Sequence, residues 1–123
     1  MRRIVALGAV LVGLSACAAP AQPAYVVFFT AFSFSLDPLA LGVVSEAAGA
    51  AATISGRILV EGYAYPAGSR QQDVVLSNLR AQRVAEALVQ DGVPRGRMVV
   101  QPRGATPGVP AVESRRVVIE LGR

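Results

Sequence analysis

The chemistry open to this chain is limited first by the side chains that it lacks. The 123-residue sequence contains no histidine, and all 12 of its basic residues are arginine. Without histidine the chain alone can build neither a Ser-His-Asp triad nor a histidine-ligated metal site. Arginine stays protonated at neutral pH, so it cannot serve as a general base or form a Schiff base. We therefore expect no enzyme activity, no catalytic residue, no cofactor and no metal.

The single cysteine, Cys17, follows a short apolar segment near the start of the chain. Arg2 and Arg3 precede an apolar run over residues 4–13, which is too short to cross a hydrocarbon core about 30 Å thick as a helix. A basic start before a short apolar run is typical of a secretory signal peptide. The next residues, Leu14-Ser15-Ala16-Cys17, resemble the lipobox of bacterial lipoproteins, in which the cysteine thiol is acylated and the preceding peptide bond is cut.

This resemblance implies a signal peptide over residues 1–16, followed by a lipidated Cys17 and a linker over residues 17–24. Several acyl chains, palmitate among them, would anchor the mature protein stably, whereas a single chain anchors reversibly. Position 18 is alanine and not the aspartate that retains such proteins in the inner membrane, which implies an outer-membrane protein facing the periplasm. The alternative is an ordinary signal peptide with a coincidental cysteine.

One domain, over residues 25–123, must then position any binding group. Density of β-branched and aromatic residues predicts a strand over residues 25–34, and further strands are expected over residues 56–63, 97–102 and 114–121. Helical spacing predicts helices over residues 38–51, with Asp37 as N-cap, and over about 73–90. The buried stripes of these helices are expected to include Leu41 and Leu79. The order βαβαββ, ending in a closing hairpin, predicts an α/β sandwich in which two helices cover one sheet.

Four motifs follow one another in this predicted framework, and together they resemble the OmpA-like peptidoglycan-binding domain over roughly residues 27–121. They are Glu61-Gly62-Tyr63 with Gly68, Leu76-Ser77-x-x-Arg80-Ala81, Leu88-Val89-x-x-Gly92-Val93-Pro94-x-x-Arg97, and Ser114-Arg115-Arg116-Val117. The family's fold is βαβαββ, in agreement with the pattern of strands and helices.

The resemblance implies a site for the diaminopimelate of the peptidoglycan stem peptide. Arg80 matches the family arginine that holds the ligand carboxylate through its planar fork of donors. Tyr65 stands where the family usually has an aspartate that pairs with the ligand ammonium, and Asp73 replaces an asparagine. Either the Tyr65 ring or the Asp73 carboxylate could take over the ammonium. Arg115 shares the parity of the inward-facing residues of the last strand, so we expect it in the site.

Each of these residues also has a purely structural explanation. Arg80 could lie on a helix surface with its charged head in water, and Asp73 could cap the second helix. Tyr65 could pack within its own loop.

We expect an outer-membrane lipoprotein of the cell envelope that tethers the membrane to peptidoglycan, weakly because the family aspartate is lost. The alternative is a periplasmic assembly subunit that docks an envelope protein partner through the apolar helix or an edge strand and no longer binds peptidoglycan. Nucleic acid is not an expected partner, because only 10 basic residues face 8 acidic ones once Arg2 and Arg3 are removed.

Overall fold

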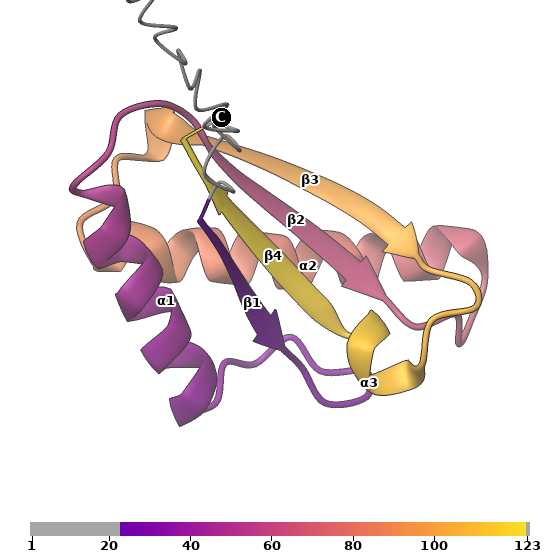
Figure 1. Cartoon of the computed structure of the whole chain (residues 1–123). Coiled ribbons are helices and arrows are strands. Elements are labelled where there is room, and N and C mark those ends of the chain that lie inside the picture. The colour runs from indigo at the N-terminus through magenta and orange to yellow at the C-terminus, as the bar shows by residue number, and fades with distance from the viewer. Residues whose placement is uncertain (1–22, 123) are drawn as a thin grey trace, which may run out of the picture.

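The computed structural model describes residues 23–122, which form four strands, two long helices and two short helical turns. In chain order these are β1 (Ala24–Phe28), α1 (Pro38–Ala51), β2 (Ile58–Ala64), α2 (Arg70–Gln90), η1 (Arg95–Arg97), β3 (Met98–Ala105), α3 (Ala111–Ser114) and β4 (Arg116–Leu121) (Figure 1). The predicted mixed α/β class and the order of the main elements are confirmed. The strand β1 begins at Ala24, inside the segment expected to be linker.

The four strands form one sheet in the order β1-β4-β2-β3. The strand β4 lies antiparallel to both β1 and β2, whereas β2 and β3 are parallel. The expected closing hairpin is therefore wrong, because β3 and β4 are not neighbours. Val117, Ile119 and Leu121 of β4 are fully buried. The central position of β4 in the sheet lets all three side chains reach the core.

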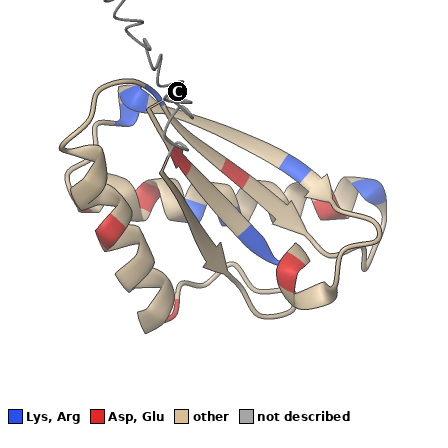
Figure 2. Cartoon of the chain, viewed as in Figure 1, with Lys and Arg blue, Asp and Glu red and all other residues tan. Residues whose placement is uncertain are grey.

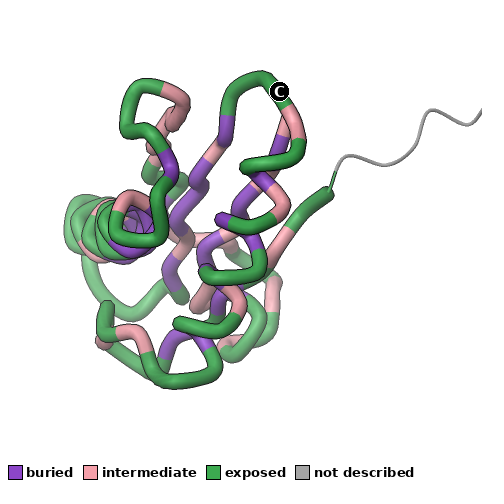
Figure 3. Tube along the Cα trace, turned by 90° about the vertical axis from the view of Figure 1, so that its left-hand side faces the viewer, coloured by how far each residue is buried: buried purple, intermediate pink, exposed green. Residues whose placement is uncertain are grey.

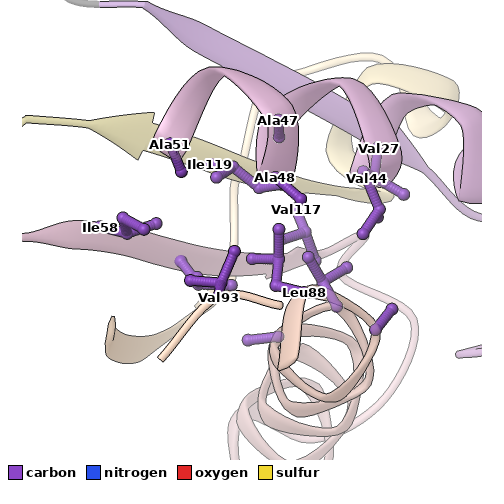
Figure 4. Close-up of a cluster of buried hydrophobic side chains, with 14 of the residues drawn as sticks. Val27, Val44, Ala47, Ala48, Ala51, Ile58, Leu88, Val93, Val117 and Ile119 are labelled. Carbon is purple, nitrogen blue, oxygen red and sulfur yellow. The ribbon is translucent and has the colours of Figure 1, made fainter. Parts of the chain in front are cut away.

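Both long helices cover the same face of the sheet, as predicted. Val27, Ile58 and Ile119 from three strands join one buried cluster with Val44 of α1 and Leu88 of α2 (Figure 4). Figure 3 shows the buried residues concentrated between the helices and the sheet. Most buried residues of α1 are alanines, whose small side chains let a helix backbone approach the sheet closely.

The two helix starts illustrate one correct and one wrong prediction. Asp37 caps α1, and its carboxylate accepts a hydrogen bond from the Ala40 amide at 2.7 Å. The helix α2 begins at Arg70, three residues before the predicted start at Asp73. Ser69 and Gln72 form a reciprocal capping box there, so Asp73 is not the helix cap.

The buried stripes of both helices differ from the predicted ones at one leucine each. Leu41 and Leu79 are 49% and 39% exposed, so neither belongs to the core. In α2 the residues facing the sheet include Ser77, Arg80 and Val84, which recur at intervals of three and four. The prediction chose Leu79 instead of its neighbour Arg80, because an arginine was not expected among buried residues.

The first strand is shorter than predicted, since β1 ends at Phe28 and residues 29–37 form a loop. Within this loop the Ser33 amide donates to the Thr30 carbonyl at 3.1 Å, which closes a tight turn. At the other end of the sheet, the Leu121 amide donates to the Pro23 carbonyl at 3.0 Å. The ends of the described domain therefore lie together, opposite the loops that follow β1 and β2 (Figure 1).

The charged residues are spread over helices and strands without a large region of one sign in the view of Figure 2. In the part of the chain that the structure describes, no helix has both the length and the apolar character needed to cross a membrane.

Candidate ligand-binding site

A cavity of about 540 Å³ opens at the end of the sheet where β1 and β2 finish. It is formed by the loops after these two strands, the first half of α2, and the segment that joins α3 to β4. Its volume falls within the range usual for small-ligand sites, about 300–1,000 Å³. The lining residues are Ala31, Phe32, Tyr65, Ala67, Gly68, Gln72, Asp73, Leu76, Arg80, Ala111 and Arg115.

The cavity brings together the four binding residues named from the sequence. Asp73 and Arg80 come from α2, Tyr65 from the loop before it, and Arg115 from the residue that precedes β4. The proposed lipidation site, Cys17, lies outside the described residues. The fold thus gathers side chains that are up to 50 positions apart in sequence, from Tyr65 to Arg115.

Arg80 is the most buried of these residues, because its side chain is 0% exposed. Its guanidinium donates hydrogen bonds to the carbonyls of Ser33 at 2.8 Å, Tyr63 at 3.1 Å and Thr30 at 3.1 Å. The guanidinium also lies over the Phe29 ring, 5.3 Å from its centroid. The alternative of a helix-surface arginine with its head in water is therefore wrong.

The charge of Arg80 makes the cavity floor electropositive. Burial, together with the nearby charge of Arg115, lowers the pKa of Arg80 to about 10, so the guanidinium remains protonated at neutral pH. None of its three hydrogen-bond partners is a carboxylate. A guanidinium has five N–H donors, so two remain beyond those used by the carbonyls. This arrangement favours an anionic group in the cavity.

Asp73 is the acidic residue of the cavity, and it is only 6% exposed. Among residues 23–122 its carboxylate forms no hydrogen bond or ion pair, and the helix start beside it is already capped by Ser69. Asp73 and Arg80 lie seven residues apart, so they occupy one side of α2 about 10 Å apart along its axis. Because this carboxylate lines the cavity and is not used by the protein's own donors in the described part of the chain, Asp73 is a candidate for binding a cation.

Arg115 and Tyr65 complete the polar lining. The Nε of Arg115 donates to the Ala111 carbonyl at 3.1 Å, which fixes the side chain beside α3. The next residue, Arg116, points to the other side, where its guanidinium lies 4.1 Å from the centroid of the Tyr63 ring. Tyr65 is 43% exposed and therefore borders solvent rather than packing fully within its loop.

Two features of the site carried no signal in the sequence. The short helix α3 lies in a segment rich in glycine and proline that was expected to be a loop, yet its Ala111 lines the cavity. Phe32 also lines the cavity, from a position expected to lie in a strand. In residues 23–122 no group of three acidic, cysteine or histidine side chains is placed to hold a metal.

Comparison with known proteins identifies the family. A profile described as the OmpA family matches residues 28–115, which is more than half of the chain. None of the curated proteins matches the chain. Fifty-two chains of solved structures do match.

One is the peptidoglycan-associated lipoprotein from Burkholderia pseudomallei, with 22% identity and a TM-score of 0.71 over 78% of this chain and 88% of that one. A second is the OmpA-like domain of FopA1 from Francisella tularensis, with 18% identity and a TM-score of 0.67 over 80% of this chain and 70% of that one. A third is a periplasmic domain of MotB from Helicobacter pylori, with 20% identity and a TM-score of 0.66 over 79% of each chain.

At these identities the structural matches show a shared fold. The family consists of structural and binding proteins rather than enzymes, which confirms the expectation that the chain is not an enzyme. The family profile, the βαβαββ order and the matching folds lead to one conclusion: the chain belongs to the OmpA family.

Proposed function

We propose that this chain is an outer-membrane lipoprotein whose OmpA-like domain binds the diaminopimelate of peptidoglycan in the cavity between Asp73 and Arg115. The observation that carries the proposal is the convergence of Asp73, Arg80 and Arg115 on one cavity. The name of the Burkholderia protein, a peptidoglycan-associated lipoprotein, supports the same function.

The charges suit a ligand that carries an ammonium and a carboxylate on one carbon atom. The ligand carboxylate would lie toward Arg115 and the buried charge of Arg80. The ligand ammonium would pair with Asp73, which replaces the carboxylate lost at Tyr65. Asp73 and Arg80 are two helical turns apart on one side of α2, so both can face a ligand in the same cavity.

The position of the cavity also supports a tether. The cavity lies at the carboxyl end of β1, whereas residue 23, which continues toward Cys17, lies at the amino end of this strand (Figure 1). A membrane anchor and a peptidoglycan site at opposite ends of the domain would allow both to be bound at once.

Exchanging the charged groups of the cavity tests the ligand site. Asp73→Asn is expected to weaken binding to diaminopimelate-containing sacculi about 10- to 150-fold, because a charge-assisted hydrogen bond is worth about 1.5–3 kcal/mol. Adding Tyr65→Asp to this variant should restore binding, since the pair recreates the family pattern of aspartate at 65 and asparagine at 73. Co-sedimentation of the full chain with sacculi measures both effects.

Sacculi with lysine in place of diaminopimelate are the matched control, because lysine in the stem peptide has an ammonium but lacks the second carboxylate. Wild type should bind them far less. If wild type binds neither kind, the cavity has no peptidoglycan function. The assembly-subunit alternative, to which the 83% exposed Leu39 on α1 would contribute, then becomes the better explanation.

The proposed lipid anchor has its own test. Cys17→Ser should release the protein from the membrane fraction or leave an uncleaved precursor, because serine cannot form the thioether to the lipid. Detergent partitioning and intact mass of the wild type and variant measure this. A wild-type protein without acyl mass would contradict the lipoprotein proposal while leaving the cavity proposal intact.

A further inference from the structure

Phe32 has the backbone conformation least expected for its type. Its φ is 55°, and it is the only non-glycine residue with positive φ among residues 23–122. For a bulky side chain this left-handed conformation is a strained exception. Its side chain is nevertheless 75% exposed, so burial of the ring does not offset the strain.

The strain is imposed by contacts on both sides of Phe32. The turn from Thr30 to Ser33 is closed by the hydrogen bond between the Ser33 amide and the Thr30 carbonyl. Arg80 binds the carbonyls of both of these residues, from the adjacent helix α2. Phe32 occupies the third position of this turn, where a positive φ favours glycine or asparagine. Glycine there would satisfy the same hydrogen bonds without strain.

The strained turn places Phe32 in the lining of the cavity, where it adds an apolar ring to a lining that also contains charged groups. Asp73, Arg80 and Arg115 supply the charges, whereas Phe32 and Tyr65 supply two aromatic rings from separate loops, one largely and one partly exposed. Strained backbone that the fold maintains without a packing gain is characteristic of ligand sites. The division into charged and aromatic parts suits a ligand with a charged end and a saturated carbon chain.

We propose that Phe32 is a ligand-contacting residue, whose ring packs against the aliphatic carbon chain of the molecule whose charged end lies near Asp73 and Arg115. The proposal rests on the proposed function, and it adds an apolar contact to the charge pairs. The strained turn would then serve to hold the ring in place before the ligand arrives, which lowers the entropy lost on binding.

Two substitutions separate the ring from the strain. Phe32→Ala removes the ring and keeps a side chain in the strained conformation, whereas Phe32→Gly removes both. In the full chain purified in detergent, both variants should bind diaminopimelate-containing sacculi about tenfold more weakly than wild type, through the loss of apolar contact area. Phe32→Gly should melt about 4 °C or more above Phe32→Ala, because alanine is unfavourable at positive φ.

Phe34→Ala is the matched control in the same loop. Phe34 is also an exposed aromatic residue, at 44%, but it lines a separate shallow hollow beside Leu79 and Arg83. This variant should bind sacculi as wild type does. If wild type binds and Phe32→Ala binds equally well, the contact proposed for Phe32 is refuted and the charge-based site stands. If wild type does not bind, both proposals fail.

Discussion

Replacing Arg80 with alanine should lower the free energy of unfolding by about 3 kcal/mol or more, because buried carbonyls that lose their partners are costly. The carbonyls of Thr30, Ser33 and Tyr63 all accept hydrogen bonds from this one side chain. The variant would also leave a void beneath the cavity, since Arg80 is the largest fully buried side chain in the part of the chain that the structure describes. Urea denaturation followed by circular dichroism measures the change.

Arg83→Ala provides the matched control three residues along the same helix. The Arg83 side chain is half exposed, and its ion pair with Glu86 spans 3.3 Å at the surface. Surface pairs of this kind contribute about 0–1 kcal/mol, so the variant should be nearly as stable as wild type. Equal stabilities for the two variants would show that Arg80 does not hold the loop after β1.

This expectation decides how the ligand site should be tested. A loss of sacculus binding in Arg80→Ala would follow from a collapsed loop as readily as from a missing ligand contact. Asp73→Asn keeps the size of the side chain and removes only its charge. The Asp73 variant therefore reports on the ligand, whereas the Arg80 variant reports first on the fold.

Gly62→Ala should lower the free energy of unfolding as much as Arg80→Ala does, by about 3 kcal/mol or more. Overpacking against backbone cannot be relieved by a rotamer change. A Cβ atom at Gly62 would lie 2.0 Å from the carbonyl oxygen of Ser77, in the middle of α2. The strand β2 and the helix α2 would have to separate, and with them the two walls of the cavity that they carry. Thermal unfolding of the purified chain measures the effect.

The same substitution at Gly49 is the control. A Cβ atom there meets nothing within 4 Å, and Gly49 lies inside α1. Gly49→Ala should therefore raise stability by about 1 kcal/mol, through the better helix propensity of alanine. If Gly62→Ala unfolds at the wild-type temperature, the close approach of α2 to β2 is wrong.

Local signals in the sequence were sufficient for most of the elements. Asp37 and Pro38 predicted the start of α1 at the residue where it occurs, because capping depends on hydrogen bonds within one turn. The same reasoning failed at α2, where Ser69 and Asp73 are both good caps and the sequence does not say which is used. The hairpin between β3 and β4 was also wrongly predicted, because strand adjacency depends on pairing between distant segments.

By itself, the sequence determined the family, the order of strands and helices, and the candidate residues Asp73, Arg80 and Arg115, because motifs and periodicity are local properties of the chain. Only the tertiary structure decided what these residues do. The sequence left Arg80 open as a ligand residue or a surface group, and burial made it the support of the loop after β1 while leaving the Asp73 carboxylate unpaired within the cavity. Phe32 acquired its strained φ in a turn whose Thr30 and Ser33 carbonyls accept hydrogen bonds from Arg80, 50 and 47 residues further along the chain. Burial and imposed strain depend on contacts between distant segments, which exist only once the chain has folded.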